Sequence, residues 1–170
     1  MYREIEGDLI TLALGGSFDV IAHGCNCFCT MSAGIAPQMA KTFGCNNFFL
    51  ENNDFKGDIL KLGTIDYEKR ELKNPSVIST VPFEKGRTIY VVNAYTQFNY
   101  GSNHLDGVST PLDYEALTLC MRKMNRVFKD RHIGLPLIGC GLAGGDWNIV
   151  KSIIQKELVN CDVTVVFYKK

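Results

Sequence analysis

The segment 23–36, HGCNCFCTMSAGIA, places a histidine, an asparagine and three cysteines directly before a run of small residues. Histidine titrates near neutral pH, and an asparagine amide both donates and accepts hydrogen bonds. The spacing disfavours a metal site, because Cys25, Cys27 and Cys29 alternate too tightly for a usual zinc knuckle and lack a partner cluster. Alternation in an extended loop instead points the three thiols alike, so we expect them to pack or line a wall.

A second run of small residues occupies positions 139–145, GCGLAGG. It satisfies G-x-G-x-x-G, but it lies near the C-terminus and Asp162 precedes the last predicted strand, so the context disfavours a dinucleotide dehydrogenase. As a thiolate nucleophile, Cys140 would need a neighbour that lowers its pKa. The alternative is a small buried residue.

Apolar runs and turn residues predict alternating strands and helices, and therefore an α/β fold. We expect strands at 2–6, 20–23, 62–67, 77–81, 89–94, 134–138 and 163–168. We expect helices at 34–43, ended by Gly44, at 109–129, started by Ser109-Thr110-Pro111, and at 147–159. Both small-residue runs then connect a strand to a helix. In an open α/β sheet such loops gather where ligands bind, and their N–H groups can hold phosphate oxygens.

Composition narrows the function classes. A chain of 170 residues fits one domain, expected over 1–170, and eighteen basic against eighteen acidic residues disfavour general nucleic-acid or membrane binding. No apolar run has the length of a membrane helix. Seven cysteines and no basic-then-apolar leader favour a reducing compartment, so we expect a cytoplasmic protein.

Four pieces of the sequence together resemble the macro domain family, which binds ADP-ribose. They are GDLI at 7–10, the strand leading to Asn26, SAGIA at 32–36 and LPLIGCGL at 135–142. NAYTQ at 93–97 and DYEAL at 113–117 add a resemblance to the branch of terminal ADP-ribose protein glycohydrolase and the yeast and phage ADP-ribose 1″-phosphate phosphatases. The resemblance implies a three-layer α/β/α domain with a mixed central sheet and no metal or cofactor.

The resemblance also implies ligand contacts. Asp8, beside Leu9, would accept a hydrogen bond from the adenine amino group, although it could instead cap the next short segment. Tyr168 would lie against the adenine, although it could be an ordinary packed aromatic. The loops around the diphosphate and distal ribose would consist of Ser32, Ala33, Gly34 and Ile35, and of Gly139, Cys140, Gly141, Leu142 and Ala143.

Three residues are candidates for catalysis at the distal ribose. Asn26 would contact the ribose or orient a water, with a turn-forming role as the alternative. His23 or Asp146 would handle the proton, with a buried histidine and a helix cap as the respective alternatives. The glycohydrolase of this branch uses a lysine whose place falls near Tyr95 here, and an aspartate whose place is Ala143, so covalent lysine chemistry is unsupported.

We therefore expect an enzyme that binds ADP-ribose and hydrolyses a derivative at the distal ribose, converting ADP-ribose 1″-phosphate to ADP-ribose and phosphate. One alternative is a non-catalytic module that binds ADP-ribose. Another is a hydrolase that removes ADP-ribose from modified protein or nucleic acid, so that the partner is an ADP-ribosylated macromolecule.

Overall fold

The computed structural model describes residues 1–51, 55–72, 87–100 and 110–169. Its strands are β1 (Tyr2–Gly7), β2 (Val20–Asn26), β3 (Ile65–Leu72), β4 (Arg87–Gln97), β5 (His132–Leu135) and β6 (Asp162–Tyr168). Its α-helices are α1 (Leu9–Leu14), α2 (Ala36–Phe43), α3 (Phe48–Glu51), α4 (Tyr114–Val127) and α5 (Trp147–Glu157). Two short 3-10 helices are η1 (Cys45–Asn47) and η2 (Ile59–Lys61).

The strands of the described part form one mixed sheet in the order β1-β6-β5-β2-β4-β3. The pairs from β1 to β4 are parallel, and β3 is antiparallel to β4. The parallel strands therefore end at one side of the sheet, called here the carboxyl edge, where open α/β sheets bind ligands.

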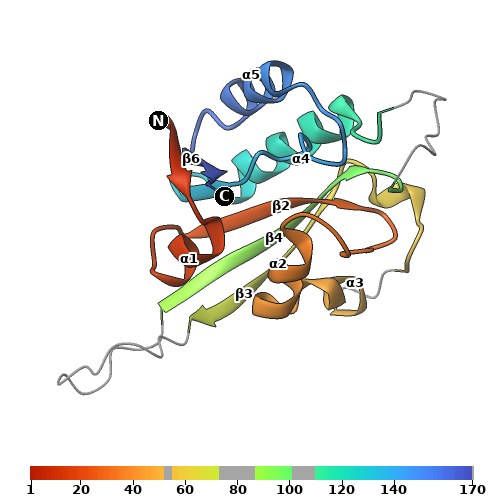
Figure 1. Ribbon diagram of the computed structural model, residues 1–170, viewed down its shortest axis with the longest axis horizontal. Coiled ribbons are helices and arrows are strands. Elements are labelled where there is room, and N and C mark those ends of the chain that lie inside the picture. Colours follow the sequence, from red (N-terminus) through yellow and green to blue (C-terminus); the bar gives the residue numbers. More distant parts are fainter. Residues whose placement is uncertain (52–54, 73–86, 101–109, 170) are drawn as a thin grey trace.

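Helices cover both faces of the sheet, with α4 and α5 on one side and α1, α2 and α3 on the other (Figure 1). One apolar cluster packs the first pair against the sheet, and a second cluster packs α1, α2 and η1 against the opposite face. Because successive strand residues point to opposite faces, Val20 and Ala22 join the first cluster and Ile21 joins the second. The predicted α/β fold with three layers and a mixed sheet is confirmed.

Helix α4 begins later than predicted. Its N-cap is Asp113, whose Oδ1 accepts a hydrogen bond from the N–H of Ala116 at 2.9 Å. Thr110 and Pro111 precede the helix, and Ser109 lies outside the described residues. The predicted start at Ser109-Thr110-Pro111 is therefore wrong, because the carboxylate at 113 is the group that satisfies a free N–H of the first turn.

Other boundaries also differ from the predictions. β5 ends at Leu135 rather than at position 138, because Pro136 has no N–H for the sheet and the N–H of Ile138 turns back to the Pro136 carbonyl at 2.7 Å. The strand expected at 62–67 begins at Ile65, and the strand expected at 77–81 lies outside the described residues. Helix α1 was not predicted, since its single apolar turn is too short to show a helical period. No helix in the described ranges combines the length and apolar character required to span a bilayer.

Candidate functional site

Asp8 and Tyr168 are brought together at the carboxyl edge. The parallel register places Gly7 opposite Tyr168, so Asp8 lies beside the end of β6, while Leu9 is buried beneath. Asp8 Oδ1 caps α1 by accepting the Thr11 N–H at 2.7 Å, and Tyr168 is 68% exposed. The other carboxylate oxygen of Asp8, beside an exposed aromatic residue, suits a flat heterocycle that carries an amino group.

The loop after β2 presents backbone N–H groups to solvent before α2. Ser32, Ala33 and Gly34 are exposed, and Gly34 has φ +63 with open space where a Cβ would stand. None of the N–H groups of 32–35 donates a hydrogen bond to a described residue, and no side chain caps α2. These donors, together with the positive end of the helix, favour an anion.

The loop after β5 presents a second set of free N–H groups. It closes on itself through hydrogen bonds from Gly145 N to the Gly139 carbonyl at 2.8 Å and from Gly144 N to the Gly141 carbonyl at 3.0 Å. The N–H groups of Gly139, Gly141, Leu142 and Ala143 donate to no described residue. Leu142, at the tip of the loop, is 82% exposed.

Glycines permit this tight closure. A Cβ on Gly145 would stand 2.6 Å from the Gly139 carbonyl oxygen and 2.4 Å from Leu112 Cδ2. Gly139 has φ +73 and is similarly close to Leu112. Neither loop contains lysine or arginine, so anion binding here would depend on backbone donors alone.

Asn26 organises the turn between β2 and the first loop. Its Oδ1 accepts the N–H groups of Phe28 at 3.0 Å and Thr30 at 3.2 Å, and its Nδ2 donates to the Thr30 carbonyl at 3.1 Å. The side chain is 5% exposed. Asn26 therefore makes the turn-forming contacts. Its second amide hydrogen has no acceptor among the described residues and is available to a ligand or a water molecule.

His23 is fully buried on the face of the sheet that η1 covers. Asn93 Nδ2 donates to the Cys45 carbonyl at 2.8 Å, which turns Asn93 Oδ1 toward His23 Nε2 at 2.7 Å. Nε2 therefore carries the hydrogen, and Nδ1 has no partner among the described residues. Burial lowers the pKa of His23 to about 4, with the Asn93 hydrogen bond acting against that shift, so the ring is neutral at pH 7.

Asp146 follows the second loop and is exposed. Its Oδ1 caps α5 by accepting the Asn148 N–H at 2.8 Å, and its own backbone N–H donates to the Tyr114 hydroxyl at 2.9 Å. The second carboxylate oxygen has no partner among the described residues. Tyr114 thus fixes the end of this loop, a role that our sequence analysis missed because it depends on a contact between α4 and α5.

The cysteines near Asn26 pack together as expected, but the cause is not alternation along an extended loop, because the chain turns at 27–28 and Cys29 has φ +55. Cys25, Cys27 and Cys29 form one buried cluster with Tyr95, away from solvent. Burial raises the pKa of the Cys25 thiol and of the half-exposed Cys140 thiol, so neither is an activated thiolate. In the part of the chain that the structure describes, no three His, Cys, Asp or Glu residues are grouped to hold a metal ion.

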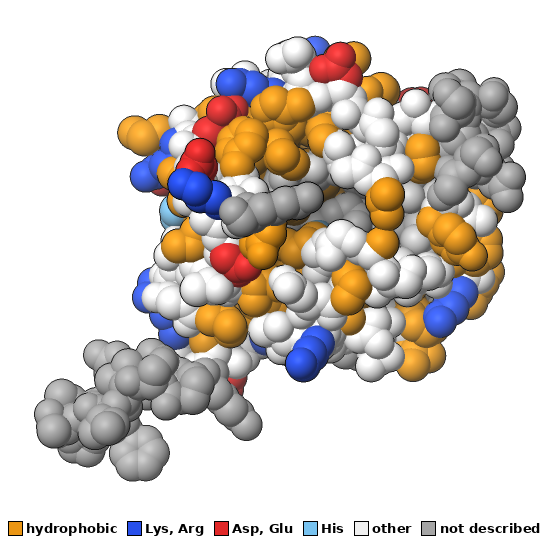
Figure 2. Space-filling view, in the orientation of Figure 1, with side chains coloured by type: hydrophobic (Ala, Val, Ile, Leu, Met, Phe, Trp, Pro, Cys, Tyr) orange, Lys and Arg blue, Asp and Glu red, His pale blue; other side chains and the backbone are white. Residues whose placement is uncertain are grey.

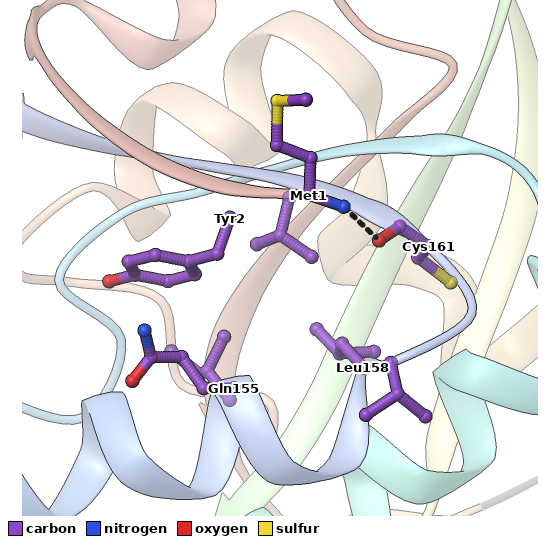
Figure 3. A pocket seen from close by; sticks show the side chains of 8 residues that line it. Met1, Tyr2, Gln155, Leu158 and Cys161 are labelled. Atoms are coloured by element: carbon purple, nitrogen blue, oxygen red, sulfur yellow. Dashed lines mark hydrogen bonds between the residues drawn. The ribbon is translucent and has the colours of Figure 1, made fainter.

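A hollow of about 250 Å³ lies at the opposite end of the sheet. The starts of β1 and β6 and the end of α5 form it, and Figure 3 shows Met1, Tyr2, Gln155, Leu158 and Cys161 around it. Because these are the amino ends of the strands, the hollow is remote from both N–H loops. On the face seen in Figure 2, basic side chains are interspersed with acidic and neutral ones.

The structure thus gathers most of the predicted site residues at one edge. Asn26 and Tyr168 are the last residues of β2 and β6, and Asp8, Asp146 and the two loops follow the carboxyl ends of parallel strands. His23 and Tyr95 lie beneath this edge with fully buried side chains. An edge that carries an exposed aromatic residue with a neighbouring carboxylate and two loops with free N–H donors can hold an elongated anionic ligand.

Comparison with known proteins gives one clear sequence relative. The chain is 32% identical over 172 residues to an uncharacterized 17.5 kDa protein in the tk-vs intergenic region of Enterobacteria phage T4, covering 96% of this chain and 94% of that protein. No protein-family model matches the chain.

Solved structures share the fold at lower identity. A Bacteroides thetaiotaomicron protein of unknown function is 24% identical with a TM-score of 0.69, covering 98% of both chains. The macrodomain of Mycobacterium tuberculosis DarG is 16% identical with a TM-score of 0.63, covering 98% of this chain and 97% of that chain. Thermosipho africanus DarTG, solved in complex with ADP-ribose, is 14% identical with a TM-score of 0.64, covering 97% of this chain and 41% of that chain.

Proposed function

Because the chain belongs to the same family as the 17.5 kDa phage T4 protein and has the macrodomain fold, we propose that its carboxyl-edge site binds ADP-ribose. The observation that carries the proposal is the pair of loops, 32–35 and 139–143, whose N–H groups lack acceptors among the described residues. Backbone donors at a helix start hold a diphosphate without cationic side chains. The complex of Thermosipho africanus DarTG with ADP-ribose, on the same fold, supports this ligand.

We propose further that the site hydrolyses ADP-ribose 1″-phosphate to ADP-ribose and phosphate. Asn26 would hold the attacking water through its remaining amide hydrogen. The water would attack phosphorus while the bond from phosphorus to the 1″ oxygen breaks, and Asp146 would take the water's proton through its uncapped oxygen and return it to the departing 1″ oxygen. The loop N–H groups would stabilise charge that develops on the phosphate. We assign the proton step to Asp146 rather than His23, because the His23 ring has no exposed surface.

The test is phosphate release from ADP-ribose 1″-phosphate by matched variants. Asn26→Asp keeps the oxygen that accepts from Phe28 and Thr30 but loses both amide hydrogens, the one donated to the Thr30 carbonyl and the one left for water, so we expect the rate to fall roughly 100-fold. Asp146→Asn keeps the helix cap and should also lower the rate roughly 100-fold. Asp58→Asn is the control, since Asp58 caps η2 and has no place in the proposed mechanism. Unchanged rates in the first two variants would remove the mechanism.

A second candidate is a module that binds ADP-ribose without turnover. It is favoured by the structural contacts that Asn26 and Asp146 already make within the protein, in the turn and in the cap of α5. Tight binding of ADP-ribose without phosphate release would select this candidate. Release of ADP-ribose from a modified macromolecule, without activity on the 1″-phosphate, would select the third alternative.

A further inference from the structure

A buried ion pair lies beneath the Asn26 turn. Lys61, at the end of η2, is 4% exposed, and its Nζ is 2.9 Å from Asp66 Oδ2 on β3. The Tyr95 hydroxyl donates to the same oxygen, and the Lys61 ammonium lies 4.5 Å from the centroid of the Tyr95 ring. These three residues, Lys61, Asp66 and Tyr95, are called here the ionic brace.

Burying these charged groups costs free energy, but the contacts among them fix the three side chains in one geometry. Removing a lysine and an aspartate from water costs several kcal/mol per ion unless the pair is close and hydrogen bonded. Here the carboxylate has both an ammonium and a hydroxyl donor, and the ring faces the cation. An apolar core would fill the same volume at lower cost, so a fixed geometry is the property that the brace adds.

The brace contacts the turn that carries Asn26. Cys29 Sγ lies 3.8 Å from the Tyr95 hydroxyl, and the Cys29 N–H donates to the Asn26 carbonyl at 3.1 Å. Cys29 has φ +55, in the left-handed region, which costs a non-glycine residue about 1 kcal/mol. Glycine would relieve that strain but would lose the thiol that touches Tyr95. The strained residue is thus the one that joins the turn to the brace.

The backbone reinforces this connection on both sides. Tyr95 N donates to the Thr64 carbonyl at 3.0 Å, and Gly63 N donates to the Tyr95 carbonyl at 2.8 Å, which links β4 to the segment after Lys61. The backbone of Cys27 makes two hydrogen bonds. Its N–H donates to the Phe98 carbonyl at 2.9 Å, and its carbonyl accepts the Gly57 N–H at 2.8 Å. The turn is therefore attached by backbone hydrogen bonds to the chain at Gly57 and at Phe98.

We propose that Lys61, Asp66 and Tyr95 are positioning residues for Asn26. They fix the position of the Cys27–Cys29 segment relative to β3 and β4. The Asn26 amide is thereby held in place relative to the loops that would bind the ligand. The catalytic part of this inference rests on the proposed function, whereas its structural part does not. An amide displaced by about 1 Å would hold a water poorly, which typically lowers a rate up to 100-fold.

Tyr95→Phe tests the inference, because it removes only the hydroxyl that joins Asp66 to Cys29. Tyr90→Phe is the matched control, since Tyr90 lies on the same strand, faces the other side of the sheet and packs against Phe128. Cys29→Ala, with Cys161→Ala as its control, breaks the same connection while leaving the ion pair intact, and it serves if Tyr95→Phe does not fold.

The first readout is amide hydrogen exchange at Phe28 and Thr30, the two N–H groups that Asn26 Oδ1 accepts. We expect exchange there to accelerate about tenfold or more in Tyr95→Phe and Cys29→Ala and to stay unchanged in both controls. Unchanged exchange in Tyr95→Phe, or in Cys29→Ala where that variant replaces it, overturns the inference, whether or not the protein has the proposed activity.

The second readout is turnover of ADP-ribose 1″-phosphate. We expect kcat to fall about tenfold in Tyr95→Phe while KM stays within about twofold, because the two N–H loops are untouched. A brace that only supports the fold would lower the free energy of unfolding and leave kcat per folded molecule unchanged, which overturns the positioning role. If the wild-type protein neither binds ADP-ribose nor releases phosphate, the proposed function fails, and the exchange experiment alone decides whether the brace positions Asn26.

Discussion

The buried histidine predicts a pH dependence of stability that can be worked out from its surroundings. Burial lowers the pKa of His23 from 6.5 to about 4 in the folded chain, whereas the unfolded chain has the ordinary value. Between pH 4 and pH 6.5 the unfolded state therefore binds more protons than the folded state. The resulting stabilisation is complete above pH 6.5 and is lost as the pH falls toward 4.

The size of this effect follows from the two pKa values. Lowering the pH from 8 to 5 should reduce the free energy of unfolding by about 2 kcal/mol through His23 alone. A typical domain has a free energy of unfolding of about 5–15 kcal/mol, so this loss is a large part of the total. It should lower the urea midpoint of unfolding by roughly 1 M. Urea unfolding at both pH values measures the loss directly.

His23→Gln isolates the contribution of the histidine. A glutamine amide can donate to Asn93 Oδ1 as Nε2 does, but it does not titrate, so most of the loss between pH 8 and pH 5 should disappear. His132→Gln is the control and should retain the loss, because His23 is still present. Equal losses in the wild type and in His23→Gln would show that the titrating group lies elsewhere.

Two further predictions concern the ligand site. Gly145→Ala should cost about 1–3 kcal/mol of stability and weaken ADP-ribose binding roughly tenfold by calorimetry, because its methyl group meets the Gly139 carbonyl and opens the loop. Gly15→Ala, in ordinary van der Waals surroundings at the end of α1, should change neither quantity, and an unaffected Gly145→Ala would contradict the assignment of the loop. Asp8→Ser should keep the α1 cap and the unfolding midpoint but weaken ADP-ribose roughly tenfold, and undiminished affinity would show that the carboxylate does not contact adenine.

Much of the fold could be predicted because the relevant signals are local. The apolar run before His23 is a buried strand whichever neighbours it pairs with, and Gly44 has the left-handed backbone that ends a helix. The two loops were found for the same reason. Small residues between a strand and a helix leave the backbone as the main chemistry available there.

The remaining features depend on contacts between distant segments. Lys61 precedes the strand predicted at 62–67 and Asp66 lies within it, but nothing local indicates that the two side chains pair or that Tyr95 contacts them. Tyr114 resembles any helix residue until α5 brings Asp146 to its hydroxyl. For Asn26 and Asp146 the sequence left both a structural and a catalytic interpretation open. The structure contains the turn and cap contacts of the structural interpretation, and it leaves one amide hydrogen and one carboxylate oxygen for the catalytic interpretation.

Isothermal calorimetry with the purified protein and ADP-ribose decides whether the carboxyl-edge site binds this ligand. We expect saturable binding with a sub-millimolar Kd, because two sets of backbone donors and the Asp8–Tyr168 end would act on one ligand. No binding at sub-millimolar ligand would contradict it.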